Sequence, residues 1–168
     1  LFSGMRPPAS HDAVIHKARA AGVYDKNLFF ENKMTKRDMP ALFSAATMAS
    51  NLVIDLPEAR ANSANKFFDT LASAKPILLN HGGWMYDLVN QHDCGVNAWG
   101  RPAIDVATEL NHKLNDPVWL AKAGESAKRL ATNYFDRGLL AKQMEQVLQA
   151  AHAGTPELAS AIAPGTYN

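Results

Sequence analysis

The stretch N-S-A-N-K-F-F-D, residues 62–69, and the run T-L-A-S-A-K-P-I-L-L-N-H-G-G-W after it, residues 70–84, decide the fold of this chain. Residues 48–56, just before them, are an apolar run that predicts a strand buried on both faces. Residues 77–80 predict a second buried strand, which runs into a Gly-Gly loop. A helix between two such strands predicts a βαβ unit with parallel strands.

The helix between these strands begins in a polar loop. Asn62, Ser63 and Asn65 are candidate N-cap residues, because their side-chain oxygens can accept from the first unpaired amides. From Lys66 onward the apolar residues recur at helical spacing. A helix that starts at the carboxyl end of a parallel strand offers free amides and a partial positive charge to an anion, usually a phosphate.

Two charged residues of this helix permit two interpretations. Lys66 would add a full positive charge to the anion site, and Asp69 would accept hydrogen bonds from sugar hydroxyls beside the phosphate. Alternatively, the two residues form an intrahelical ion pair on a solvated polar face. Spacing alone does not decide between them.

The order of residues from Ser63 to Gly83 resembles the donor-binding signature of retaining glycosyltransferases of family 4, which have two Rossmann-like domains in the GT-B arrangement. The family pattern S-x-N-K-x-F-D/E-x-L-A-x-G-K-P-I/V corresponds here to S-A-N-K-F-F-D-T-L-A-S-A-K-P-I, residues 63–77. The resemblance extends from about residue 1 to about residue 150. It implies an α/β fold: a Rossmann-like parallel sheet with helices on both faces, forming the C-terminal half of such an enzyme and lacking its first strand and helix.

Two positions depart from the family pattern. The family commonly carries two glutamates with seven residues between them; Asp69 holds the second position and Ala61 the first, with Glu58 nearby but out of register. Ala74 replaces the usual glycine at the end of the helix, a change expected to cost little backbone freedom. The first departure leaves one contact to the transferred sugar missing or supplied by another residue.

The resemblance implies a binding site for a nucleotide-diphosphate sugar. The diphosphate would lie on the amides of residues 63–66 and the Lys66 ammonium, the ribose on Asp69, the nucleobase on the 31–35 loop, and the sugar beside the Gly-Gly loop. The expected substrate-binding residues are Ser63, Ala64, Asn65, Lys66, Asp69, Lys33, Met34, Gly82 and Gly83. No catalytic residue is assigned to this half, because transfer takes place in the cleft between the two domains. His81 could touch the phosphate or the sugar, but a lone loop histidine is more often a bystander than a catalyst.

The rest of the chain predicts further alternating elements. Before the central unit we expect a helix over residues 10–21, a strand over 27–30 and a helix capped by Asp38. After it we expect a helix over Trp84 to Gln91, with Trp84 packed on the core, and a short edge strand over Cys94 to Val96. Three helices follow: one from Pro102, one from Asp116-Pro117, and a last one. Their expected buried sides are Ile104, Ala107, Leu110 and Leu114 in the first and Leu140, Met144, Val147, Leu148 and Ala151 in the last.

Composition excludes several other classes of protein. The 168 residues are 47% hydrophobic and 20% charged, with a net charge of +1, which argues against a nucleic-acid scaffold. A single cysteine and six scattered histidines give no zinc-ligand spacing, and no Asp-x-Asp metal motif is present, so no metal or other cofactor is expected. The sequence also lacks a phosphate loop, a nucleophile elbow and a membrane-spanning run. The expected location is the cytoplasm or the cytoplasmic face of the inner membrane.

The resemblance therefore implies the donor-binding part of a retaining glycosyltransferase that makes a cell-surface polysaccharide or lipopolysaccharide. Residues 1–152 would form the donor-binding domain and 153–168 a C-terminal tail. Its partners would be the sugar donor and an N-terminal acceptor domain of the same parent chain, without which transfer is not expected; membrane association would come through that half. Two alternatives stay open: a nucleotide-sugar 2-epimerase-like domain, and a non-catalytic nucleotide- or protein-binding module.

Overall fold

The computed structural model describes residues 2–3, 8–31, 34–54, 56–155 and 157–158. The chain divides into two compact units, Leu1–Leu42 and Phe43–Asn168. Each unit is described by itself below.

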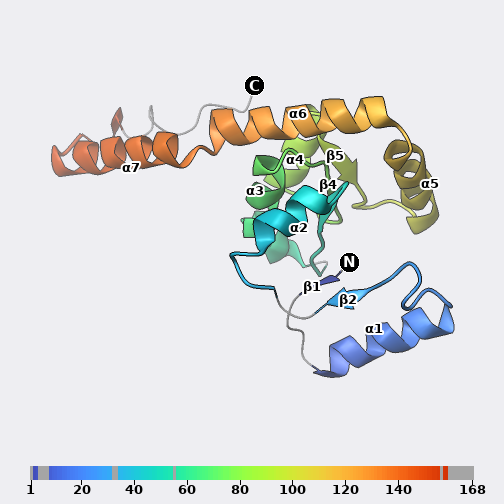
Figure 1. The fold of residues 1–168 in the computed structure, drawn as a ribbon. Coiled ribbons are helices and arrows are strands. Elements are labelled where there is room, and N and C mark those ends of the chain that lie inside the picture. The colour runs from blue at the N-terminus through green and yellow to red at the C-terminus, as the bar shows by residue number, and fades with distance from the viewer. Residues whose placement is uncertain (1, 4–7, 32–33, 55, 156, 159–168) are drawn as a thin grey trace. The chain divides into compact units, whose positions relative to one another are not determined.

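The first unit holds a pair of short parallel strands and one helix. Strand β1 (Phe2–Ser3) pairs with β2 (Phe30–Glu31), and α1 (Pro8–Ala20) connects them (Figure 1). The predicted helix and strand of this region are therefore confirmed, with ends shifted by one to three residues. Helix α2 (Met39–Ala45) crosses the boundary between the units.

The second unit contains the predicted βαβ unit and the helices that follow it. Its elements, in chain order, are β3 (Ala49–Asn51), the 3₁₀ helix η1 (Pro57–Ala61), α3 (Asn65–Ala72), β4 (Ile77–Leu79), α4 (Trp84–Gln91), β5 (Gly95–Asn97), α5 (Ala103–Leu114), α6 (Pro117–Tyr134) and α7 (Arg137–His152). The bounds of α4 are those predicted. Asp116 caps α6 as expected, because its Oδ1 accepts from the N–H groups of Val118 and Trp119.

Strands β3, β4 and β5 form one parallel sheet with β4 in the middle. Asn51, Leu79 and Asn97 lie side by side at the last position of the three strands. Because all three strands run the same way, the loops that follow them leave the same edge of the sheet.

The core of this unit lies between β4 and three helices. It is formed by side chains of α3, β4, α4 and α6, all with exposed fractions of 1% or less: Phe67, Leu71, Ile77, Leu79, Met85, Leu88, Val89, Ala127 and Leu130, together with Cys94. Burial raises the pKa of the Cys94 thiol to about 12, against a smaller opposing effect of a backbone hydrogen bond. This core fixes α3 and α4 against the sheet and thereby positions their first residues.

The prediction of a long strand over residues 48–56, buried on both faces, is wrong. Strand β3 ends at Asn51, and beyond it Leu52, Ile54 and Leu56 are exposed, Ile54 to 72%. The backbone of Val53 is paired with a side chain instead of a strand: its N–H donates to Asn80 Oδ1 and its carbonyl accepts from Asn80 Nδ2, both at 2.9 Å. The side-chain amide of Asn80 thus makes the two hydrogen bonds that a backbone peptide group would make if the sheet continued, and the ladder between β3 and β4 ends here.

The predicted buried sides of α5 and α7 are also wrong. On α5, Ile104 and Leu114 are exposed, and the buried residue is Val106. On α7, Leu140, Met144 and Leu148 are exposed, Met144 to 59%, whereas Ala150 is buried. Figure 1 shows α7 extending beyond the end of α6. Periodicity identified an apolar face of α7, but no part of the described chain covers most of it.

The predicted domain limits, 1–152 and 153–168, stay a prediction. Residues 159–168 lie outside the described part of the chain. None of the described helices has the length and apolar character needed to span a bilayer.

Candidate functional site at the carboxyl edge of the sheet

The N-terminus of α3 differs from its prediction. Asn62, Ser63 and Asn65 do not cap it: the N-cap residue is Ala64, in extended conformation, and no side chain caps the helix. The register is fixed by the core, since Phe67 and Leu71 must face β4, and this places Asn65 inside the first turn. The first amides of α3 are therefore left without a side-chain acceptor.

Lys66 and Asp69 are both exposed on α3. Among the described residues, no ion pair joins them; the ion pairs present are His11–Asp12, Arg101–Glu109, Lys113–Glu109 and Arg129–Glu125. The intrahelical pair that was the alternative interpretation is thus not formed.

Trp84 brings the start of α4 to the loop that precedes α3. Its indole Nε1 donates to the carbonyl of Asn62 at 3.1 Å, and its ring packs against Phe67 and Phe68 with centroid distances of 5.5 and 6.1 Å. The expected packing of Trp84 on the core is confirmed. As a result, residues 63–66 and the Gly-Gly loop, predicted as one site, adjoin each other through this contact.

The two glycines of this loop are required for different reasons. Gly83 has φ 102° and ψ −172°, a conformation open essentially to glycine alone. Gly82 is buried, and a Cβ placed on it would lie 2.8 Å from two carbons of the Trp99 indole. Trp99, in the turn after β5, therefore forms a wall against the loop that the sequence analysis did not identify.

The turn that carries Trp99 is held by charged residues. The Arg101 guanidinium donates to the carbonyl of Asn97 at 2.9 Å and contacts Glu109 at 2.7 Å, while Lys113 contacts the same carboxylate at 3.0 Å. Burial acts to raise the pKa of Glu109, but hydrogen bonds from Lys113 and Arg101 outweigh it and the pKa is lowered. Glu109 thus stays ionised and anchors the turn to α5.

His81 is not an exposed loop residue. It is 3% exposed, and both of its ring nitrogens face polar atoms of Asn51 and Gly82. Asn51 is also 3% exposed and was not singled out from the sequence. The available signal was positional: Asn51 and Asn97 end β3 and β5, Asn80 follows β4, and polar residues at this edge face the loops.

The remaining predicted residues belong to the first unit. Met34 is half-buried in that unit, and Lys33 lies outside the described residues. Their assignment to the nucleobase stays a prediction.

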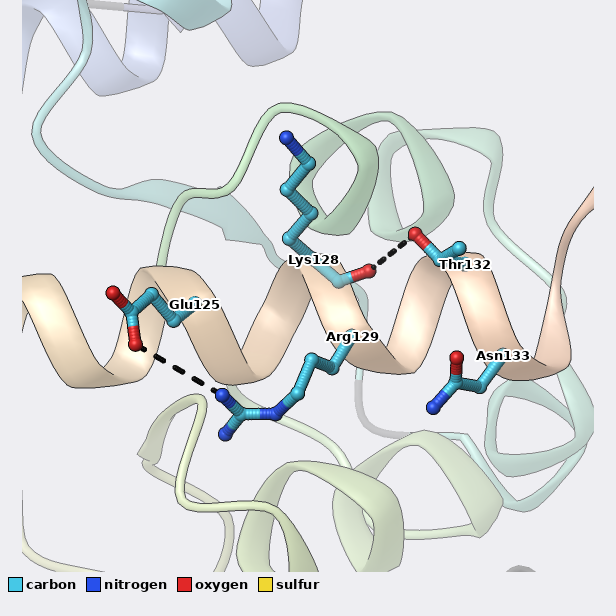
Figure 2. Close-up of a pocket in the computed structure, with 5 residues that line it drawn as sticks. All are labelled: Glu125, Lys128, Arg129, Thr132 and Asn133. Atoms are coloured by element: carbon cyan, nitrogen blue, oxygen red, sulfur yellow. Dashed lines mark hydrogen bonds and ion pairs between the residues drawn. The ribbon is translucent and has the colours of Figure 1, made fainter.

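A separate hollow lies on the surface of α6, away from the residues predicted from the sequence. It has a volume of about 320 Å³ and is lined by side chains of that helix alone, namely Glu125, Lys128, Arg129, Thr132 and Asn133 (Figure 2). Glu125 and Arg129 are one turn apart, 3.9 Å from each other and mostly exposed. An open hollow on one helix has none of the convergent buried groups of a ligand site, so we do not treat it as the functional site. No cluster of three or more metal-ligating side chains occurs in the described ranges.

Comparison with known proteins agrees with this geometry at the level of the fold. No protein-family model and no curated protein matches the sequence. Among solved structures, the chain is similar to sucrose-phosphate synthase from Thermosynechococcus elongatus, with a TM-score of 0.76, 16% sequence identity and 90% of this chain covered. The match covers 38% of that protein's chain, so this chain spans well under half of its length. The fold is therefore α/β and Rossmann-like, as predicted, and is similar to that of part of this synthase.

Proposed function

We propose that this chain is the donor-binding part of a retaining glycosyltransferase, which holds a nucleotide-diphosphate sugar at the carboxyl edge of β3–β5. The proposal depends mainly on one observation: the hydrogen bond from Trp84 to Asn62 links the N-terminus of α4 to the loop before α3. Both α3 and α4 begin there without a side-chain cap, and Lys66 is exposed beside them. Two uncapped helix N-termini and a lysine suit a diphosphate, with no metal required.

A contrast among the helices of the second unit supports this proposal. Helices α3, α4 and α5, each of which is the first α-helix after a strand of the sheet, have no side-chain cap, whereas α6 and α7, which follow other α-helices, are capped by Asp116 and Asp136. A carboxylate cap would occupy the amides and repel an anionic ligand. Its absence at the sheet edge leaves those amides available to a phosphate.

The missing first glutamate has a candidate replacement. Glu58 and Ala61 both lie on η1, and residues three apart on a 3₁₀ helix lie on the same side, about 6 Å apart. In this proposal the exposed carboxylate of Glu58 contacts the transferred sugar from one turn earlier. If Glu58 does not make this contact, the absence of a glutamate at position 61 favours the alternative function, a non-catalytic binding module.

Other parts of the proposal rest on the family resemblance. Asp69 holds the ribose, Lys33 and Met34 lie by the nucleobase, and the product is a bacterial surface glycan made on the cytoplasmic side of the membrane. An acceptor domain of the same parent chain would supply the other wall of the cleft, and the exposed apolar stripe of α7 is a surface for it to cover.

The test is a calorimetric titration with UDP, GDP and ADP and with their glucose or mannose conjugates. The variants are Lys66→Ala and Asp69→Ala, and the matched control is Lys128→Ala, which removes the same charge from the hollow on α6. We expect saturable binding of one nucleotide, weakened about tenfold by Lys66→Ala, as for loss of a charge-assisted hydrogen bond, and unchanged by the control. Equal losses in Lys66→Ala and Lys128→Ala, or no binding at all, would refute the proposed site.

A further inference from the structure

His81 lies two residues beyond the end of β4, and both ring nitrogens contact polar groups. Its Nδ1 lies 3.0 Å from the carbonyl oxygen of Gly82, and its Nε2 lies 3.4 Å from the side-chain nitrogen of Asn51. His81 and Asn51 are each 3% exposed, so water does not supply hydrogen-bond partners to the imidazole or to the Asn51 amide. A histidine with both nitrogens engaged and almost no exposed surface does not contact a ligand directly.

The contacts determine which ring nitrogen carries the proton. A carbonyl oxygen only accepts, so Nδ1 carries the hydrogen and donates it to Gly82. In the neutral ring Nε2 is then an acceptor, which suits the amide N–H of Asn51. Asn51, at the end of β3, thus selects the tautomer of His81, and His81 in turn binds the loop after β4.

The bond to Gly82 also fixes the direction of the next N–H group. In a trans peptide the carbonyl and the following N–H point in opposite directions. Since the Gly82 carbonyl is drawn toward the buried imidazole, the Gly83 N–H points away from it. Within the described part of the chain this N–H has no acceptor, and Gly83 is half-buried beside the start of α4.

We propose that His81 is a positioning residue: through Gly82 it aims the Gly83 N–H at an oxygen acceptor of the bound donor. Asn51 acts with it by fixing the tautomer. The ligand part of this inference rests on the proposed function, whereas the tautomer and the order of the loop do not. His81 itself does not touch the donor.

Two substitutions separate the two contacts of the imidazole. In His81→Asn the side-chain nitrogen is attached to Cγ, as Nδ1 is, so the bond to Gly82 is kept and the bond to Asn51 is lost. In His81→Gln the terminal group reaches the place of Nε2, so the bond to Asn51 is kept and the bond to Gly82 is lost. Both variants remove the ring, and each serves as the control for the other's loss of packing.

Nuclear magnetic resonance of the unliganded protein provides the first measurement. Nitrogen shifts of His81 should show a protonated Nδ1 and a bare Nε2. Hydrogen exchange at Asp87, whose N–H donates to the Gly83 carbonyl, should be faster in His81→Gln by about fivefold to tenfold, as for loss of one hydrogen bond, and close to wild type in His81→Asn. A protonated Nε2 with a bare Nδ1, or equal exchange in the two variants, overturns the inference.

Titration with the nucleotide sugar that binds the wild type provides the second measurement. We expect His81→Gln to weaken binding about fivefold to tenfold and His81→Asn to bind within about twofold of wild type. Equal affinities of the two variants overturn the positioning role while leaving the proposed function intact. If the wild type binds no nucleotide sugar, the proposed function fails together with the ligand part, and the tautomer and exchange data alone decide whether His81 orders the loop.

Discussion

Helices α3 and α7 both have an apolar face at helical spacing, but only that of α3 is buried. On α3, Phe67 and Leu71 have no exposed surface and pack against β4, α4 and α6. On α7, Leu140 and Leu148 lie on one face at a spacing of eight residues and are 41% and 58% exposed. The difference teaches that periodicity reveals which face of a helix is apolar but not whether anything covers it.

The largest expected effect tests whether this difference exists in solution. Phe67→Ala should lower the free energy of unfolding by about 3–5 kcal/mol, because it removes a fully buried ring. Met144→Ser on α7 should change it by less than about 0.5 kcal/mol, because its side chain is mostly exposed. Urea unfolding measures both. A loss of several kcal/mol in Met144→Ser would mean that the α7 face is covered in solution, by a second copy or by part of the same chain.

A second prediction tests whether water is excluded from the core around Cys94, which α3 covers. Burial raises the pKa of Cys94 from 9.0 to about 12, so the folded state keeps the thiol proton where the unfolded chain loses it. The stabilisation is complete below pH 9 and is lost as the pH rises toward 12, by up to about 4 kcal/mol. Unfolding of wild type and Cys94→Ala, compared at several alkaline pH values, isolates this contribution from the lysines common to both. Parallel pH profiles would indicate that water reaches Cys94 and that the core is less closed than its burial suggests.

The contrast between α3 and α7 also explains which parts of the fold could be predicted from the sequence. Local signals predicted what local physics decides: Asp116-Pro117 starts α6, and the bounds of α4 agree with the prediction. The start of α3 was misplaced, because three polar residues compete as caps and only the packing of Phe67 selects Ala64. Burial on α5 and α7 depends on partners far away in the chain, which periodicity does not contain.

The candidate site shows the same division. The resemblance predicted that residues 63–66 and the Gly-Gly loop belong to one site, and the contact from Trp84 to Asn62 lies between these two segments. The contact of Trp99 with Gly82 joins two loops that are separate in the sequence, and no local pattern predicts it. The pairing of Asn51 with His81 likewise depends on the neighbouring positions of β3 and β4.

A third prediction concerns Ala74, which follows the end of α3 and lies against α6. Its φ is 55°, a left-handed conformation that costs a residue with a Cβ about 1–2 kcal/mol, so the expected small cost was an underestimate. The backbone is held there by close packing, since a Cβ on Gly124 of α6 would lie 2.5 Å from the Ala74 carbonyl oxygen. Ala74→Gly should therefore stabilise the protein by about 1 kcal/mol. The matched change Ala72→Gly, at the last position of α3, should destabilise the protein by up to about 1 kcal/mol, and the same sign for both would show that Ala74 is not strained.

The smallest effect compares two equivalent caps on helices that differ in their attachment to the core. Asp116 caps α6, whose Ala127 and Leu130 are buried against α3, and Asp136 caps the exposed α7 through the Leu139 N–H at 2.9 Å. Asp116→Ala should lower the free energy of unfolding by about 1 kcal/mol, because α6 unfolds only with the core. Asp136→Ala removes a similar interaction, but from a helix that can fray alone, so the loss should appear as faster hydrogen exchange within α7 and leave the main transition unchanged. If Asp136→Ala shifts that transition as far as Asp116→Ala does, α7 unfolds cooperatively with the core, and its apolar stripe must be in contact with something that stabilises it.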